Sequence, residues 1–364
     1  MKPPIFVVGS MRSGSTLLRL LLDSHPHIAI GEETGFMGAV AATKAIPNWR
    51  YGREWYGRLG WSEDELDARL RDFFTEMFER HAANQGKERR GDKTPLHSLH
   101  MAEMARIFPD AVFVGIVRHP GAVVWSLKRR FHWQVAEAAA YWESTNVEVL
   151  RQGAHLGDDR FALVRYEDLV EDPETTLREL TSWLDEPWSQ DLLRHNDVQA
   201  AKGAPRLVDG STSTRDPISS QRVDRWESGL DDVERRSVAE ATSGLAGFLG
   251  YDASTARRPA PIVGVDGSGR RLLLTGTSLA RRQREHNGAV SFSPRRQVVA
   301  LPEMDPADLA RRLQQAESSL ARVRSRPIVR FSDALRRAQR RLDLPRGVRR
   351  LTALSKSGAR RQHG

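Results

Sequence analysis

Apolar residues gather in three short uninterrupted runs along the first 165 residues. These runs are residues 5–8 (IFVV), 111–117 (AVFVGIV) and 161–164 (FALV). A continuous apolar run of about four to eight residues is typical of a strand buried on both faces, as in a parallel sheet covered by helices. The segments between the runs are longer, and their apolar residues recur every three or four positions. The pattern predicts an α/β fold with a parallel sheet flanked by helices.

Helix signals mark most of these longer segments. Leucines recur over 17–22, directly after a stretch of small residues. Ser62 and Glu65 form a capping-box pattern ahead of an apolar face that extends to Phe78. Further helices are expected over residues 95–108, 120–130, 135–150, 175–184 and 231–249.

Charged residues divide the chain unevenly. Residues 251–364 contain 25 Arg and Lys against 9 Asp and Glu, whereas residues 1–250 contain 31 against 38, so the net charge of +9 comes from the C-terminal third. We expect one domain over 1–251, then a mainly helical or disordered C-terminal extension. Within it, 252–307 is expected to be a linker or partly ordered segment. Residues 308–364 are expected to form a basic helical tail with either a short coiled coil or an ordinary amphipathic helix.

The basic tail suits an anionic partner. Alternating arginines and apolar residues after position 326 are typical of segments that contact an anionic membrane surface or a polyanion. No nucleic-acid motif accompanies the tail, so specific nucleic-acid binding is not expected.

Composition removes several classes of site. The sequence has no cysteine, which excludes disulfides and thiolate metal ligands. No apolar run approaches the roughly 20 residues of a membrane-spanning helix, and the first run begins at Ile5, too early for a signal peptide to precede it. We therefore expect a cytoplasmic protein. Its oligomeric state stays open, and a homo-oligomer is among the states allowed.

The residues after the first apolar run form a candidate anion-binding loop. Gly9 ends the run, small residues fill 10–15, and a helical pattern follows. Backbone N–H groups of such a loop and of the first helical turn converge on one point, where the helix dipole favours negative charge. A glycine turn without a ligand has the same elements, so the loop alone leaves both interpretations open.

This loop departs from the phosphate-binding loop of ATPases. In the pattern G-x-x-x-x-G-K-[ST], Gly9, Gly14 and Thr16 fall in register, but Ser15 stands in the place of the lysine. The cation lies inside the loop instead, as Arg12. The loop therefore favours a phosphoanhydride without a γ-phosphate over ATP.

The residue after the second apolar run also argues against an NTPase. A magnesium-dependent NTPase carries an aspartate for the metal at such a strand end. Here the run 111–117 leads to Arg118. An arginine can hold a phosphate directly, so this position also counts against an NTPase.

The sequence of this region resembles that of the sulfotransferase family. That family binds its donor, 3′-phosphoadenosine 5′-phosphosulfate (PAPS), with a loop of the form [KR]-S-G-[ST]-T. The stretch RSGSTLLRLLLDSHPHIAIGEET is most similar to the tyrosylprotein sulfotransferases and their bacterial relatives, and the resemblance covers 5–251 in five ordered motifs. It implies a P-loop, nucleotide-kinase-like sulfotransferase fold, PAPS as donor and no metal. It also implies that the 5′-phosphosulfate is held by Arg12, Ser13, Gly14, Ser15 and Thr16.

Further site residues follow from the resemblance, motif by motif. The second glutamate of G-E-E-T is the family's catalytic base and corresponds to Glu33. The lysine of D-K-x-P, which stabilises the leaving phosphate, corresponds to Lys93. The pair R-x7-S, which binds the 3′-phosphate, corresponds to Arg118 and Ser126. The remaining donor contacts are assigned to Tyr166 of R-Y-E-D-L, beside the adenine, and to Arg222 in the segment 217–226.

Together these motifs predict a sulfotransferase that moves a sulfonate from PAPS to an acceptor hydroxyl by in-line, metal-independent displacement. A carbohydrate, glycolipid or metabolite is favoured as acceptor, because a cytoplasmic protein seldom meets secretory peptides. Two other functions stay open: a P-loop small-molecule kinase, and a non-catalytic binding or scaffold protein on the same fold. An aromatic group has two interpretations, core packing or the wall of an acceptor pocket; it comprises Trp49, Tyr51, Trp55, Tyr56 and Trp61.

Overall fold

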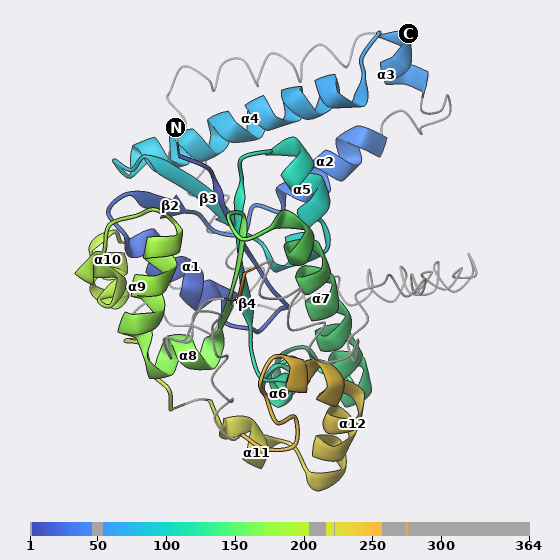
Figure 1. The fold of residues 1–364 in the computed structure, drawn as a ribbon, viewed down its shortest axis with the longest axis vertical. Coiled ribbons are helices and arrows are strands. Elements are labelled where there is room, and N and C mark those ends of the chain that lie inside the picture. Colours follow the sequence, from blue (N-terminus) through green and yellow to red (C-terminus); the bar gives the residue numbers. More distant parts are fainter. Residues whose placement is uncertain (1, 46–53, 204–215, 222, 257–273, 276–364) are drawn as a thin grey trace, which may run out of the picture. The chain divides into compact units, whose positions relative to one another are not determined.

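The computed structural model describes residues 2–45, 54–203, 216–221, 223–256 and 274–275, and their core is a six-stranded sheet (Figure 1). The strands lie in the order β2-β3-β1-β4-β5-β6. Strands β1 to β5 are parallel, and β6 pairs antiparallel with β5. Their bounds are β1 (Ile5–Val8), β2 (Ile28–Ile30), β3 (Arg89–Lys93), β4 (Val112–Val117), β5 (Phe161–Arg165) and β6 (Leu274–Thr275).

The sheet separates two hydrophobic cores. Along β1 the side chains of Ile5 and Val7 enter one core, and those of Phe6 and Val8 enter the other, as the two-residue period of a strand requires. The first core holds residues of α1 (Ser15–Ser24), α8 (Tyr166–Glu171), α9 (Pro173–Trp183) and η3 (Gln190–Leu192), and α10 (His195–Ala201) packs against α1. The second holds residues of α2 (Phe36–Ala45), α4 (Glu63–Asn84), α5 (Met101–Ile107), α6 (Pro120–Phe131), α7 (Val135–Leu156), α11 (Arg225–Gly229) and α12 (Asp232–Phe248).

The predicted parallel sheet flanked by helices is thus confirmed. Each of the three apolar runs forms a strand, β1, β4 and β5. The capping box at the start of α4 is present: the Glu65 N–H donates to Ser62 Oγ at 3.2 Å, and the Ser62 N–H donates to Glu65 Oε2 at 2.8 Å. Patterns that depend on neighbouring residues alone therefore predicted their elements well.

Strand β3 is the main correction to the sequence analysis. No strand was predicted around Lys93 from the sequence, but Arg89–Lys93 forms a buried strand between β2 and β1. Its sequence RRGDK contains no apolar side chain. The charges are tolerated because they have partners: Arg89 lies 3.1 Å from Glu186, and Lys93 forms an ion pair with Glu33.

The segment between α2 and α4 supports core packing for its aromatic residues. Tyr56, in α3 (Glu54–Arg58), stacks on Trp61 with ring centroids 5.8 Å apart, and both pack against the second core. Trp49, Tyr51 and the side chain of Trp55 lie outside the described residues.

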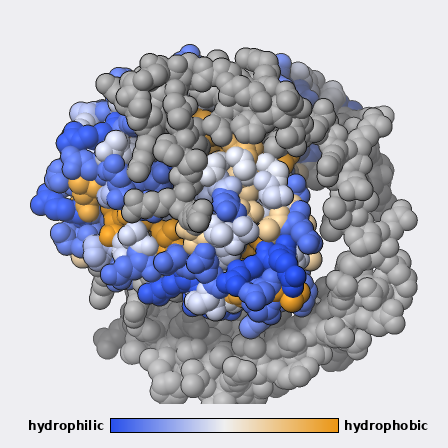
Figure 2. Space-filling view, turned by 60° about the horizontal axis from the view of Figure 1, so that its bottom comes forward, coloured by the Kyte–Doolittle hydropathy of each residue, from blue (hydrophilic) through white to orange (hydrophobic). Residues whose placement is uncertain are grey.

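Only part of the predicted C-terminal extension falls on described residues. β6 belongs to the segment expected to be a linker or partly ordered, and Leu274 is buried at the edge of the sheet. The predicted basic tail lies outside the described residues. Among the helices that the structure describes, none has the length and apolar character needed to cross a membrane. On the face shown in Figure 2, the described surface is mostly hydrophilic, with hydrophobic residues in small groups.

Candidate active site

The candidate site residues gather at the carboxyl edge of the parallel sheet. Arg12 follows β1, Arg118 follows β4 and Tyr166 follows β5, while Lys93 ends β3 and Glu33 follows β2. Parallel strands end at the same edge, so residues far apart in sequence meet there. The chain turns to one side of the sheet after β1 and to the other after β4, and open α/β sheets bind ligands at such a reversal.

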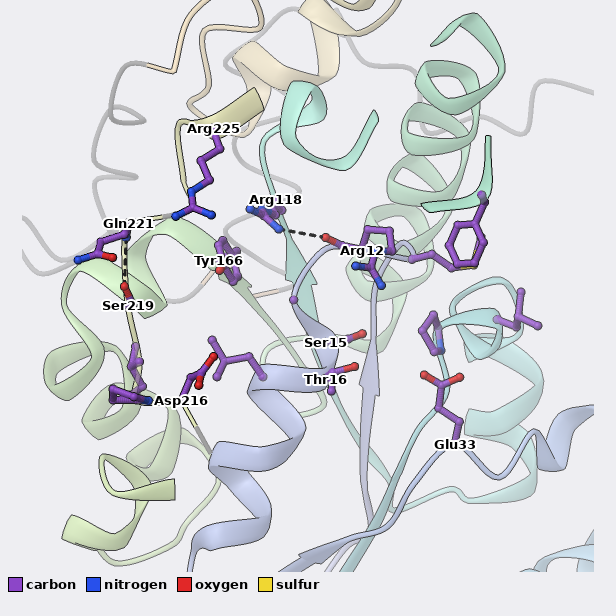
Figure 3. A pocket seen from close by; sticks show the side chains of 18 residues that line it. Arg12, Ser15, Thr16, Glu33, Arg118, Tyr166, Asp216, Ser219, Gln221 and Arg225 are labelled. Atoms are coloured by element: carbon purple, nitrogen blue, oxygen red, sulfur yellow. Dashed lines mark hydrogen bonds between the residues drawn. The ribbon is translucent and has the colours of Figure 1, made fainter. Parts of the chain in front are cut away.

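A cavity of about 750 Å³ opens at this edge (Figure 3). Its size is that of a nucleotide or drug-sized ligand. The loop after β1, the first turn of α1, the end of α6 and described residues of the segment 216–225 contribute to its wall. Of the residues singled out in the sequence, it is lined by Arg12, Gly14, Ser15, Thr16, Glu33, Arg118 and Tyr166.

The loop before α1 is shaped to hold an anion. Gly14 is the N-cap of α1 in the left-handed conformation, with φ of 97°. The first helical hydrogen bond runs from the Leu18 N–H to the Gly14 carbonyl, so the amides of residues 15–17 have no partner within the helix. The first turn carries no acidic side chain that could compete with a ligand.

Arg12 is held at the cavity by three neighbouring contacts. Its own φ is 70°, which is uncommon for a residue with a side chain. Its Nε donates to Ser126 Oγ at 2.9 Å, and Arg118 donates to its carbonyl at 3.5 Å. The preceding amide, of Met11, donates to the Tyr141 hydroxyl at 2.8 Å. Burial raises the pKa of Tyr141, which keeps that hydroxyl neutral.

Arg118 and Tyr166 form a stacked pair next to Arg12 (Figure 3). The Arg118 Cζ lies 4.2 Å from the centroid of the Tyr166 ring. The Tyr166 ring also touches the anion loop, since a Cβ added at Gly14 would overlap it. The glycine of the loop is therefore required by its left-handed φ and by the close approach of the tyrosine.

Lys93 and Glu33 form an ion pair at the rim of the cavity. The Lys93 side chain is 3% exposed and that of Glu33 is 53% exposed, so the carboxylate faces solvent and the cation lies behind it. Lys93 Nζ also donates to Thr16 Oγ1 at 3.3 Å. The pair thus joins the start of α1 to the loop after β2.

Four assigned residues are not among the described residues of the cavity wall. Lys93 is buried behind Glu33 and contacts Thr16 and Glu33, which do line the cavity. Ser13 does not line the cavity: it is fully buried, and its N–H donates to the Ser10 carbonyl at 3.2 Å. Ser126 lies behind Arg12, which it contacts directly. Arg222 lies outside the described residues.

The structure adds lining residues that the sequence analysis missed. Gln221 and Arg225 belong to the segment in which Arg222 was singled out, and both reach the cavity wall. Leu96 and Phe131 also line the cavity, although they are 64% and 47% exposed. The two arginines of the sequence 222–225 could have indicated Arg225 as a ligand contact. Nothing in the sequence distinguishes Leu96 or Phe131 from other apolar residues.

Trp226 anchors the segment that carries Arg225. Its ring stacks on His119 with centroids 4.5 Å apart, and a Cβ added at Gly121 would overlap it. Burial lowers the pKa of His119, so the ring is neutral; it accepts from the Gly121 N–H at 3.1 Å and contacts the Asp252 carbonyl at 2.8 Å. His119 is therefore a packing residue, and its contacts fix one wall of the cavity.

A possible metal group lies away from the cavity. Among the described residues, side chains able to ligate a metal gather at His25, His27 and Glu186. Their atoms are already engaged: His25 Nε2 lies 2.7 Å from the Pro187 carbonyl, and Glu186 lies 3.1 Å from Arg89. We interpret this group as structural.

Sequence comparisons with known proteins point to one family. Residues 3–190 match the family model described as "Sulfotransferase family". Protein-tyrosine sulfotransferase 1 of Danio rerio is 30% identical over 263 residues, which are 69% of this chain and 72% of that protein. The protein-tyrosine sulfotransferase of Drosophila melanogaster is 27% identical over 69% of this chain and 52% of its own length. Among solved structures, the sulfotransferase domain from the curacin biosynthetic pathway has a TM-score of 0.49 and 21% identity, over 68% of this chain and 98% of the domain. By its sequence match, the chain belongs to the sulfotransferase family.

Proposed function

We propose that this sulfotransferase transfers the sulfonate of PAPS to the hydroxyl of a tyrosine side chain, with Glu33 as base and Lys93 as the cation beside the leaving group. The observation that carries the proposal is the Lys93–Glu33 ion pair at the rim of a cavity whose wall includes an anion loop. A base, a cation and an anion site at one cavity are the parts that sulfonate transfer needs.

The residues present fit a doubly phosphorylated nucleotide. The amides of residues 15–17 and the side chain of Arg12 suit the 5′-phosphosulfate, and Arg118 suits the 3′-phosphate. Arg225 adds a cation to the same wall. The flat Arg118–Tyr166 stack suits the adenine side. PAPS, when bound, supplies the sulfonate that is transferred.

The chain's own residues divide the chemistry between them. Glu33 accepts the acceptor's hydroxyl proton as the acceptor oxygen forms its bond to sulfur and the bond from sulfur to the phosphate oxygen breaks. Lys93, fixed between Thr16 and Glu33, neutralises the negative charge that develops on the departing phosphate. These side-chain cations support a transfer that needs no metal.

The apolar mouth of the cavity supports an aromatic acceptor. Leu96 and Phe131 line it while 64% and 47% exposed, and apolar surface exposed at a cavity is typical of a ligand-binding site. Pro95 also lines the cavity. The relatives named above are called protein-tyrosine sulfotransferases, so a tyrosine hydroxyl is preferred here over the saccharide or metabolite expected from the sequence.

Calorimetric titration with 3′-phosphoadenosine 5′-phosphate (PAP), beside ADP and ATP with and without magnesium, tests the donor. We expect selective, metal-independent binding of PAP that Arg118→Ala abolishes. Preference for ATP with magnesium would favour the kinase alternative instead, and binding of neither nucleotide would favour the scaffold.

Transfer of sulfonate to a tyrosine peptide, compared with a saccharide panel, tests the acceptor and the base. Glu33→Gln is expected to lower turnover strongly, while PAP affinity stays close to that of the unmodified protein. Retained turnover in Glu33→Gln would remove Glu33 from the role of base. Faster transfer to a saccharide than to the peptide would restore the acceptor class expected from the sequence.

A further inference from the structure

The loop that carries Glu33 is fastened to β3 by side chains rather than by sheet pairing. β2 pairs with β3 only over Ile28–Ile30, opposite Arg89 to Gly91. Beyond that point, Asp92 Oδ1 accepts hydrogen bonds from the Thr34 N–H at 3.3 Å and from the Thr34 hydroxyl at 2.7 Å. Asp92 precedes Lys93 and Thr34 follows Glu33, so this contact sets how the ion-pair partners face each other.

A buried histidine, His97, lies between Asp92 and the backbone of the loop that carries Glu33. His97 Nε2 accepts from the Met37 N–H at 3.3 Å, so the proton of the neutral ring lies on Nδ1. That Nδ1 lies 3.1 Å from Asp92 Oδ2, with the two side chains 3% and 1% exposed. Asp92 is thus held by two hydrogen bonds to Oδ1, with the His97 ring beside Oδ2. Moving it would deprive the Thr34 N–H and hydroxyl of their acceptor, which is costly.

Two further contacts hold the same loop. The Gly35 N–H donates to Thr94 Oγ1 at 3.3 Å, and the Phe36 ring lies edge-on to His97 with centroids 4.6 Å apart. Residues 34–37 are therefore connected at several points to residues 92–97. The backbone next to Glu33 is placed by these contacts.

Glu33 depends on that backbone for its position. Its side chain is 53% exposed, and an exposed glutamate retains much of its rotamer freedom. A flexible side chain reaches only as far as the backbone that carries it allows. A shift of Thr34 would therefore move the Glu33 carboxylate away from Lys93 and from the acceptor.

We propose that Thr34 and Asp92, supported by His97, are positioning residues that hold Glu33 in reach of the acceptor proton. The proposal rests on the function proposed above, in which Glu33 is the base. Proton transfer requires the Glu33 carboxylate to lie within hydrogen-bond distance of the acceptor hydroxyl. Loss of the Thr34–Asp92 hydrogen bonds therefore lowers turnover. Donor binding is assigned to other residues, Arg12, Arg118 and the amides of 15–17, and is expected to stay unchanged.

Thr34→Val tests the proposal at an exposed position, because it removes the hydroxyl while keeping the backbone N–H and the branched shape. We expect kcat for a tyrosine peptide to fall about tenfold, with the PAP dissociation constant unchanged. Thr34→Ser restores the hydroxyl and should recover most of the lost turnover. Thr175→Val, at an exposed threonine in α9, is the matched control and should leave kcat unchanged.

A double-mutant cycle separates positioning from general damage. In the Glu33→Gln background, single-turnover rates should change less than about twofold on adding Thr34→Val, because the base that Thr34 positions is already gone. Equal losses in both backgrounds, or full kcat in Thr34→Val alone, would overturn the proposal. The proposed function fails differently, through absence of PAP binding in the unmodified protein.

Asp92→Asn examines the acceptor side of the same hydrogen bond. The unfolding free energy of this variant is measured in parallel, because Asp92 is buried.

Discussion

Arg12 Nε donates a hydrogen bond to Ser126 Oγ over 2.9 Å, and this contact joins two residues that the sequence assigned to opposite ends of the donor. Arg12 follows β1, and Ser126 lies on α6, which follows β4. The bond therefore joins the two neighbouring strands after which the chain leaves towards opposite sides of the sheet. Arg12 also adopts a φ of 70°. Such a conformation persists at functional sites when surrounding contacts hold it, and Ser126 supplies one of them.

Ser126→Ala should therefore weaken binding at the 5′ end as well as at the 3′ end. We expect the dissociation constants of PAP and of adenosine 5′-phosphosulfate, which lacks the 3′-phosphate, to rise together by about five- to tenfold, the value of one ordinary hydrogen bond. Calorimetry with both nucleotides measures this. An effect confined to PAP would mean that Ser126 acts on the 3′-phosphate alone, and Ser126→Thr, which keeps a hydroxyl, serves as the control.

Gly14→Ala should damage the anion loop. The added Cβ would overlap the Tyr166 ring, and alanine is strained at φ of 97°. We expect a loss of about 1–3 kcal/mol in the free energy of unfolding and a large loss of PAP affinity, measured by urea denaturation and calorimetry. Gly244→Ala is the matched control: this glycine of α12 has open space around a new Cβ, so the change should stabilise the helix by about 0.5–1 kcal/mol. Unchanged PAP affinity in Gly14→Ala would contradict the proposed role of the loop.

Gly121→Ala should lower PAP affinity from outside the cavity. The new Cβ would push against the Trp226 ring, whose neighbour Arg225 lines the cavity. We expect a several-fold rise in the PAP dissociation constant and a loss of about 1–3 kcal/mol in the free energy of unfolding from overpacking. A stability loss without any change in affinity would show that Trp226 does not anchor the wall.

Stability should fall in mild acid because of buried histidines. Burial lowers the pKa of His195 to about 4, and it lowers the pKa of His119 as well. The unfolded chain, with histidine pKa values of about 6.5, then binds protons that the folded chain does not. The free energy of unfolding therefore keeps its highest value above about pH 6.5. It falls as the pH drops towards 4, by up to about 3 kcal/mol for His195.

Urea denaturation between pH 7.5 and 4.5 checks this slope. His195→Phe should flatten part of it, because the phenyl ring cannot be protonated. His155→Gln, at an exposed histidine of α7, should leave it unchanged. A slope that is the same in all three proteins would contradict the assignment to His195.

Sequence alone determined the parts of this protein that depend on neighbouring residues. The apolar runs predicted β1, β4 and β5, and the capping box predicted the start of α4. The loop motif and the arginine after β4 predicted an anion site without the ATPase lysine or aspartate. Because parallel strands end at one edge of a sheet, residues placed at strand ends by sequence were brought to one cavity by the fold.

Only the tertiary structure decided what depends on distant partners. β3 carries charges where a central strand normally carries apolar residues, and Arg89 is accommodated by Glu186, 97 residues later in the chain. The burial of Ser13, the Arg12–Ser126 bond and the Thr34–Asp92 fastening depend equally on contacts between separate elements. A hydrogen-bond partner far along the chain leaves no local pattern, so these relationships appear only when the chain is folded.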